Sequence, residues 1–276
     1  MTTTIAFAGK GGVGKTTLAA LTIRYLTKLQ PGPVLAVDAD PSSNLNLLLG
    51  MDLAGTIADI RDDMLAQVKQ SLMQGGAAMG TLPGGLTKRD YLDYNIRASL
   101  VEGQHVDLAA MGRGEGPGCY CAVNHNLREV LDAVGRSYAY VVIDNEAGLE
   151  HLSRRTTRNV QHLLIVSDPT PRGLITAERI AAFRHELNIE IENAGLIVNR
   201  QAGHLPPALQ ARIEQFDFPL IGIVPPDEAL GQLEIDGRSI WEVGDDAPVY
   251  QAMSGILSEI LPGTAWSRTK QTLAAQ

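Results

Sequence analysis

Short apolar runs alternate with amphipathic, helix-like stretches along most of the chain. The apolar runs cover residues 3–8, 33–37, 106–110, 140–143, 162–166, 194–198 and 219–223. Continuous apolar runs of this length, separated by helical stretches such as 17–26, are typical of parallel strands that are buried on both faces. The pattern therefore predicts an α/β fold with a doubly wound, mostly parallel sheet and helices on both faces.

The same pattern suggests how the chain is organised. Its length favours one large domain, which we place at residues 1–262. Residues 52–104 are less regular, with helical patterning over 57–72 followed by glycine-rich breaks, so we expect an insertion that covers one edge of the sheet. Residues 263–276 lack core periodicity and are expected to form a C-terminal tail.

Composition narrows the classes of function. The formal net charge is −8, which argues against nucleic acid or an anionic membrane as the main partner, because both attract basic surfaces. No apolar run approaches the ~18 residues of a membrane span, so we expect no stable membrane insertion and a cytoplasmic location. The two cysteines are too few for a disulfide framework.

Residues 9–17 read GKGGVGKTT and match the phosphate-binding pattern G-x-x-x-x-G-K-[ST] between a predicted strand and a predicted helix. Glycines let the backbone wrap around phosphate oxygens with its N–H groups turned inward. In this pattern Lys15 meets the β- and γ-phosphates and Thr16 offers its hydroxyl to Mg²⁺. The predicted cofactors are ATP and Mg²⁺, and the loop residues expected to contact the nucleotide are Gly9, Lys10, Gly11, Gly12, Val13, Gly14, Lys15, Thr16 and Thr17.

Polar residues follow several of the predicted strands, where ligands of such folds bind. Asp144 resembles a Walker B aspartate in a D-x-x-x-G segment, so it could reach Mg²⁺ while Gly148 offers its N–H to the γ-phosphate. Asp40 could orient the attacking water, with Asp38 nearer the metal. Polar residues also end strands for purely structural reasons. The candidate adenine contacts are Asn199, Arg200, Pro225 and Asp227.

Cys119 and Cys121 lie two residues apart after a glycine-rich approach. On an extended backbone both thiols face one side, and two thiolates half-coordinate a metal ion. A two-fold dimer would supply four sulfurs, which suit tetrahedral Zn²⁺, square-planar Ni²⁺ or a bridging iron–sulfur cluster. The alternative is a pair of reduced thiols without a role.

GKGGVGKTT, VDADP and VVIDNEAGLEHL together resemble the deviant Walker A family of dimeric ATPases, which includes MinD, ParA and the nitrogenase iron protein. The resemblance implies that Lys10 reaches across a homodimer to the partner's nucleotide. It also implies that Asp40 orients water, and that Asp144 and Gly148 form the second switch. Lys10, Lys15, Asp40 and Asp144 are thus the expected catalytic residues.

GPGCYC, IDNEAGLEHL, IVNR and PPDE resemble the CooC-type nickel-insertion ATPases, up to about Tyr250. This resemblance implies ATP-dependent dimerisation, a Cys-x-Cys site for Ni²⁺ (or Zn²⁺) at the dimer interface, and nickel delivery to an apo carbon monoxide dehydrogenase or acetyl-CoA synthase. Two alternatives stay open, namely an ATP-gated iron–sulfur electron donor like the nitrogenase iron protein and a spatial organiser of the MinD or ParA kind.

Overall fold

The computed structural model describes residues 2–29, 32–73, 82, 85–113, 129–147, 159–183 and 190–261. One eight-stranded sheet with the order β3-β4-β2-β5-β1-β6-β7-β8 forms its centre. The strands are β1 (Thr3–Gly9), β2 (Val34–Asp38), β3 (Val101–Glu102), β4 (Asp107–Ala110), β5 (Tyr140–Asp144), β6 (Asn159–Ser167), β7 (Glu190–Asn199) and β8 (Leu220–Val224). All pairings are parallel except that of β3 with β4, which confirms the predicted sheet.

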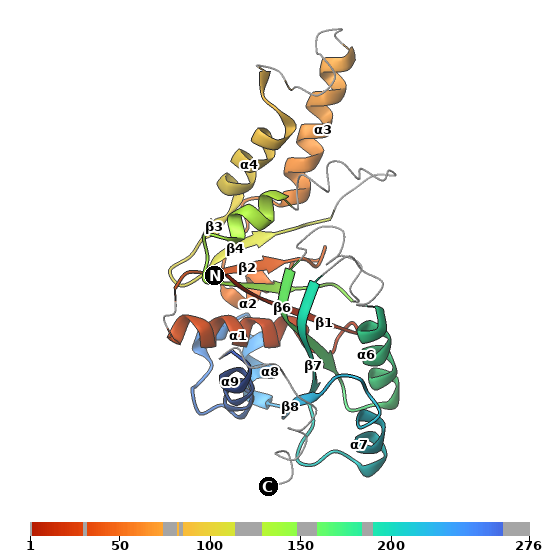
Figure 1. Cartoon of the computed structure of the whole chain (residues 1–276). Coiled ribbons are helices and arrows are strands. Elements are labelled where there is room, and N and C mark those ends of the chain that lie inside the picture. The colour runs from red at the N-terminus through yellow and green to blue at the C-terminus, as the bar shows by residue number, and fades with distance from the viewer. Residues whose placement is uncertain are drawn as a thin grey trace.

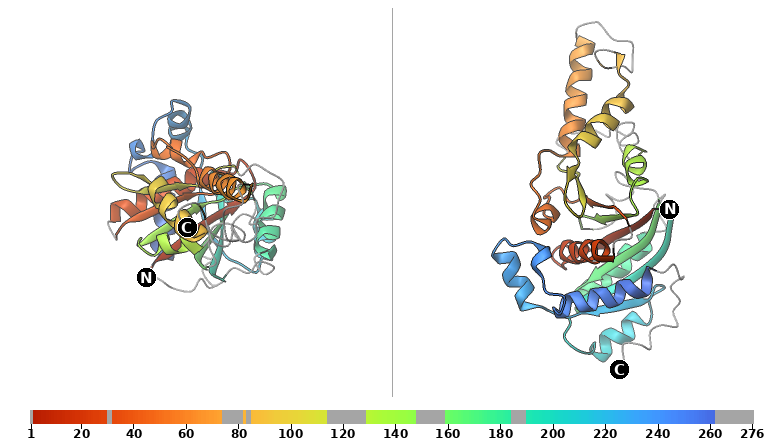
Figure 2. Two further views of the ribbon diagram at one scale, coloured as in Figure 1. Left: turned by 90° about the horizontal axis from the view of Figure 1, so that it is seen from above. Right: turned by 90° about the vertical axis from the view of Figure 1, so that its left-hand side faces the viewer.

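Helices cover both faces of this sheet (Figure 1, Figure 2). One face packs against α1 (Lys15–Leu29), α2 (Leu45–Leu49), α8 (Glu228–Ile235), the 3₁₀ turn η3 (Ile240–Glu242) and α9 (Pro248–Ile260). The other face packs against a helical stretch at residues 129–135, α6 (Pro171–Phe183) and α7 (Pro207–Ile213). The fold is therefore the doubly wound arrangement that the apolar pattern predicted.

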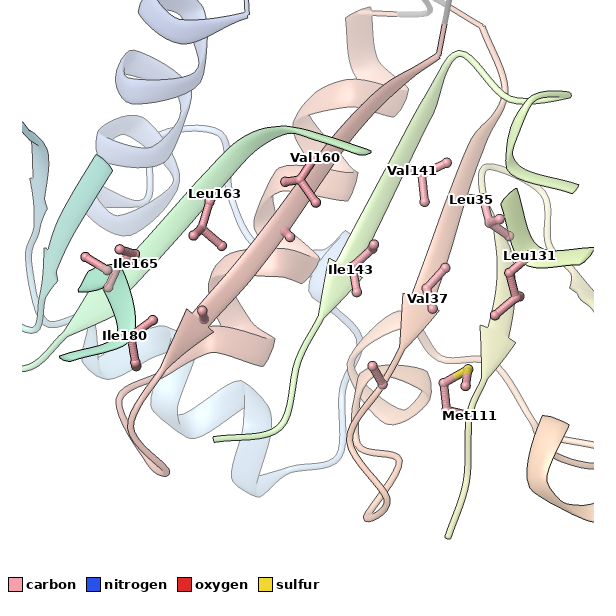
Figure 3. Close-up of a cluster of buried hydrophobic side chains, with 14 of the residues drawn as sticks. Leu35, Val37, Met111, Leu131, Val141, Ile143, Val160, Leu163, Ile165 and Ile180 are labelled. Atoms are coloured by element: carbon pink, nitrogen blue, oxygen red, sulfur yellow. The ribbon is translucent and has the colours of Figure 1, made fainter. Parts of the chain in front are cut away.

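Strand β5 shows why the predicted strands read as unbroken apolar runs. Val141 and Ile143 join the core cluster on one face, next to Leu35 and Leu131 (Figure 3), whereas Val142 joins the cluster on the other face. Because both faces of the strand are buried, every position along it must be apolar until the strand ends at Asp144.

The described residues of the segment 52–104 are more regular than its sequence pattern suggested. It contains α3 (Ile57–Met73) and α4 (Lys88–Ser99), which pack together and project away from the sheet (Figure 1). Met64, Leu92 and Ile96 are fully buried in this pair, although the polar residues of α4 hid its helical period in the sequence. The segment ends in β3, which the sequence analysis missed because only two residues pair with β4.

Close packing of α9 on β8 yields a stability prediction. Gly222 lies against Ile256, and a methyl group added at Gly222 would be 2.2 Å from the Cδ1 atom of Ile256. We expect Gly222→Ala to lower the free energy of unfolding by about 1–3 kcal/mol through overpacking. Urea denaturation of Gly222→Ala, Ile256→Ala and the double variant measures this. Because Ile256→Ala removes both Cγ1 and Cδ1, the two atoms that a methyl group at Gly222 would meet, the double variant should lose less than the sum of the single losses, and strict additivity would contradict the packing argument.

Candidate functional site

The parallel register brings the ends of the central strands to one edge of the sheet. Asp144 of β5 lies beside Phe7 of β1 on one side and Asp38 of β2 on the other. Gly9, the last residue of β1, lies beside Val166 of β6. The residues predicted to bind nucleotide therefore converge at the start of the glycine loop, where the chain leaves β1 for α1.

The glycine loop is held in place by the side chain of Lys15 at its C-terminal end and by two side chains at the end of β7. Lys15 Nζ lies 3.2 Å from the carbonyl oxygen of Lys10. Asn199 Nδ2 donates to the carbonyl of Val13 at 2.8 Å, and Arg200 Nη1 donates to that of Gly12 at 3.1 Å. These bonds place Asn199 and Arg200 against the loop that the sequence analysis assigned to phosphate.

Gly14 is the glycine on which this arrangement depends most clearly. Its φ of +93° lies in the left-handed region, and a Cβ atom there would be 2.5 Å from Nδ2 of Asn199. A larger residue would therefore be strained and would push the asparagine away from the loop.

Lys15 and Asp144 are both buried, and their electrostatics are linked. Burial lowers the pKa of Lys15, while the charges of Asp144, Asp40 and Glu146 act against this shift. Burial raises the pKa of Asp144 to about 7, and a hydrogen bond from Thr16 and the charge of Lys15 oppose the rise. The site thus concentrates a cation and several carboxylates where solvent screens them poorly.

The magnesium ion implied by ATP fits these side chains. One carboxylate oxygen of Asp144 is buried and has no hydrogen-bond partner in the structure, and the Thr16 side chain lies next to the same carboxylate. Hydroxyl and carboxylate oxygens are the donors that Mg²⁺ prefers. Thr16 and Asp144 are therefore the residues that would hold the ion or its bound water.

Asp38 and Asp40 lie on one loop after β2, but their side chains do different things. Asp38 is fully buried, and its two oxygens accept bonds from the backbone N–H groups of Asp40 at 3.1 Å and of Leu45 at 2.9 Å. Burial nevertheless raises its pKa to about 6. Asp38 therefore shapes the loop from within, whereas Asp40 is half-buried and lies close enough to Lys15 to affect its pKa.

Asn145 is a site residue that the sequence analysis did not single out. It is almost fully buried, and both its backbone N–H and its Nδ2 donate to the carbonyl of Phe7, at 3.3 and 2.8 Å. These bonds tie the end of β5 to β1 just before the glycine loop. Its place directly after Asp144, which resembles a Walker B aspartate, was the available signal.

The candidate adenine contacts gather around a pocket beside the loop. Gly14, Thr17, Asn199, Arg200, Pro225 and Asp227 line it together with residues of α8. Asp227 also begins α8, since its carboxylate accepts the N–H of Leu230 at 3.0 Å. Glu234 of α8 accepts the hydroxyl of Thr17 at 2.8 Å, a contact across 217 residues that no local pattern indicated.

Three residues named from the sequence lie outside the described residues, namely Cys119, Cys121 and Gly148. Within the described ranges, no group of three or more His, Cys, Asp or Glu side chains is arranged to hold a metal ion. None of the helices in those ranges is long and apolar enough to cross a bilayer.

Comparison with known sequences places this site among nucleotide-binding domains. Residues 4–240 match the family described as the CobQ/CobB/MinD/ParA nucleotide-binding domain. An uncharacterized ATP-binding protein of Methanocaldococcus jannaschii is 38% identical over 93% of this chain and 98% of its own length. The carbon monoxide dehydrogenase accessory protein CooC of Rhodospirillum rubrum is 29% identical over 94% of this chain and 97% of its own length.

Solved structures share the same fold at lower identity. The septum site-determining protein MinD of Pyrococcus horikoshii, solved with Mg-ADP, superposes with a TM-score of 0.64 over 95% of this chain and 98% of its own, at 22% identity. MinD of Pyrococcus furiosus gives a TM-score of 0.66 over 95% and 99% of the two chains, at 20% identity. These likenesses establish the P-loop α/β fold.

Burial of Asp144 predicts a pH-dependent stability. Its pKa in the folded protein is about 7 against an ordinary 3.8, so the charged form opposes folding. The stability that depends on the protonated form is complete below pH 3.8 and is lost as the pH rises towards 7. In metal-free and nucleotide-free protein, we expect Asp144→Asn to raise the free energy of unfolding by about 1–3 kcal/mol at pH 8.

Chemical denaturation of the wild type and Asp144→Asn at pH 5 and pH 8 measures the effect, and the gain should shrink at pH 5. Asp52→Asn, which removes an exposed carboxylate, serves as the control and should change stability little at either pH. An Asp144→Asn gain that is equal at both pH values would contradict the ionisation argument.

Proposed function

The chain belongs to the CobQ/CobB/MinD/ParA nucleotide-binding domain family, and from this premise we propose that it is an ATP-dependent metallochaperone. In this proposal the protein forms a homodimer with ATP and holds Ni²⁺ (or Zn²⁺) between a Cys-x-Cys pair from each subunit. ATP hydrolysis then drives delivery of nickel to an apo carbon monoxide dehydrogenase or acetyl-CoA synthase. Nickel is the cargo, and ATP with Mg²⁺ drives its transfer.

The observation that carries the proposal is the Cys119–Cys121 pair in a chain that is 29% identical to CooC over 270 residues. That relative is an accessory protein of carbon monoxide dehydrogenase. The cysteines are also the chain's whole complement of thiols, clustered within three residues. Thiolate pairs suit soft and borderline ions such as Ni²⁺ and Zn²⁺.

The described chain on the N-terminal side of the cysteines supports a link to the nucleotide. Ala110 ends β4 beside Asp38, and the N–H of Met111 donates to the carbonyl of Asp38 at 2.8 Å. The chain therefore leaves the sheet at the same edge as the glycine loop. Gly112, just beyond this point, precedes Cys119 by seven residues. A conformational change in the loop after β2 could therefore reach the cysteine-containing segment through the hydrogen bond between Asp38 and Met111.

Lys10 supports the dimer part of the proposal. Together with Gly11 and Gly12 it is exposed at the tip of the glycine loop, whereas Lys15 is buried. In the proposed dimer this exposed side chain reaches the nucleotide of the partner subunit, and Asp40 orients the attacking water. The active site would then be complete only when two copies meet.

A spatial organiser is the second candidate, because MinD of Synechocystis is 26% identical over 82% of this chain. Organisers of this kind bind a membrane or DNA, for which the net charge of −8 is unfavourable. Pelleting with anionic vesicles or with DNA in the presence of ATP separates this candidate from the metallochaperone.

We expect Cys119→Ser/Cys121→Ser to abolish metal binding. The test is anaerobic size-exclusion chromatography with metal analysis by mass spectrometry, after loading with Ni²⁺ in the presence and absence of ATP. The wild type should elute as a dimer with one Ni²⁺ per dimer, and the variant should still dimerise with ATP but carry no nickel. A wild type that stays metal-free, or that matches the variant, would overturn the proposal, and bound iron with sulfide would favour the electron-donor alternative.

We expect Lys10→Ala to lower the ATP hydrolysis rate by about 100-fold or more, since a cation supplied across an interface stabilises the transition state of phosphoryl transfer. ATP affinity should change little, because Lys15 and the rest of the loop remain. Lys69→Ala, which removes an exposed lysine of α3, is the charge-matched control. Hydrolysis per subunit should rise with protein concentration in the wild type, and a rate independent of concentration would argue against the two-subunit site.

A further inference from the structure

We propose that Asn199 and Arg200 form a brace that fixes the phosphate loop in its binding shape before nucleotide arrives. In this view Arg200 is a positioning residue for the phosphates and not a contact to adenine. The inference rests on the proposed binding of ATP at this loop, but it is independent of the metal that the protein carries.

Adjacent side chains from the end of β7 hold adjacent carbonyl groups of the loop. Arg200 Nη1 donates to the carbonyl of Gly12 at 3.1 Å, and Asn199 Nδ2 donates to the carbonyl of Val13 at 2.8 Å. Lys15 Nζ adds a third donor, 3.2 Å from the carbonyl of Lys10. Three carbonyls of the loop are therefore occupied by protein donors.

The planarity of the peptide bond gives these contacts a consequence for phosphate binding. In a trans peptide the C=O of one residue and the N–H of the next point in opposite directions. Holding the carbonyls of Gly12 and Val13 towards β7 therefore turns the N–H groups of Val13 and Gly14 away from it. Inward N–H groups of a glycine loop are what bind phosphate oxygens, so the brace sets the orientation of two of these donors.

The backbone at Arg200 is unusual in a way that fits this role. Its φ is +60°, a left-handed conformation that residues other than glycine and asparagine rarely adopt. The arrangement is maintained by neighbours, because the N–H of Arg200 donates to Asn199 Oδ1 at 2.9 Å and the N–H of Gln201 donates to the carbonyl of Val224 at 3.1 Å. A strained conformation that its surroundings enforce is typical of a functional position.

The charge of Arg200 is also available to the loop. Within the described part of the chain, the ion pairs join other arginines and lysines to carboxylates and do not include Arg200. Its guanidinium lies beside Gly14, with Nη2 4.0 Å from the position of a Cβ atom there. The brace therefore adds an uncompensated positive charge where a polyphosphate chain would bind.

The test compares Arg200→Asn with the wild type. Asparagine tolerates the left-handed backbone, so the variant removes the guanidinium without adding strain, and thermal unfolding should show no loss of stability. Arg136→Asn removes an exposed arginine just beyond the helical stretch at 129–135 and is the matched control. Two properties are measured, namely the affinities for Mg-ATP and for inorganic tripolyphosphate, and amide hydrogen exchange of peptides covering residues 9–16 in nucleotide-free protein.

We expect Arg200→Asn to weaken ATP and tripolyphosphate binding by a similar factor of about ten, as for loss of a charge-assisted hydrogen bond. Hydrogen exchange of the loop should become faster in nucleotide-free protein, and Arg136→Asn should change neither property.

Weaker binding of ATP alone would identify an adenine contact instead. Weaker binding of both ligands with unchanged exchange of the free loop would identify a direct phosphate contact, and no change in affinity would leave Arg200 without a role. Each of these results overturns the brace. A wild type that binds no ATP would refute the proposed function itself, which is a separate outcome.

Discussion

The register of β1 between β5 and β6 is the constraint on which the site depends. Phe7 pairs with Asp144 and Gly9 pairs with Val166, so the glycine loop begins beside the end of the strand that carries Asp144. A shift of one residue in the pairing of β1 with β5 would move Asp144 away from Thr16 and turn its side chain to the opposite face of the sheet. Asn145 stabilises this register by donating twice to the carbonyl of Phe7.

The site also contains ionisable side chains that are buried away from water. Lys15, Asp38 and Asp144 are all buried. Burial lowers the pKa of the lysine and raises the pKa of both aspartates, so in each case it favours the neutral form. In the free protein these groups cost stability, and a bound divalent cation with an anionic polyphosphate would compensate them. Part of the free energy of ligand binding would therefore come from neutralising these buried charges, and ligand binding would stabilise the fold at the strand ends.

Much of the fold followed from the sequence, because strands buried on both faces leave continuous apolar runs and all seven such runs became strands. The pattern G-x-x-x-x-G-K-[ST] likewise predicted a loop between a strand and a helix, which the structure has between β1 and α1. The roles of the loop residues and of Asp144 in nucleotide binding stay predictions. The sequence did not show which groups the buried polar side chains form hydrogen bonds with. Asp38 was expected near the metal, yet both of its oxygens bind its own loop, and only the structure shows Arg200 held at a positive φ against Gly12.

The two edges of the sheet bear on how copies of the chain can associate. Strand β3 at one edge has only two residues and runs antiparallel to β4. Strand β8 at the other edge is preceded by Pro219 and followed by Pro225 and Pro226, which have no N–H group to donate. Edges this short and this interrupted offer little template for strand addition. Self-association through a continuous sheet is thereby disfavoured.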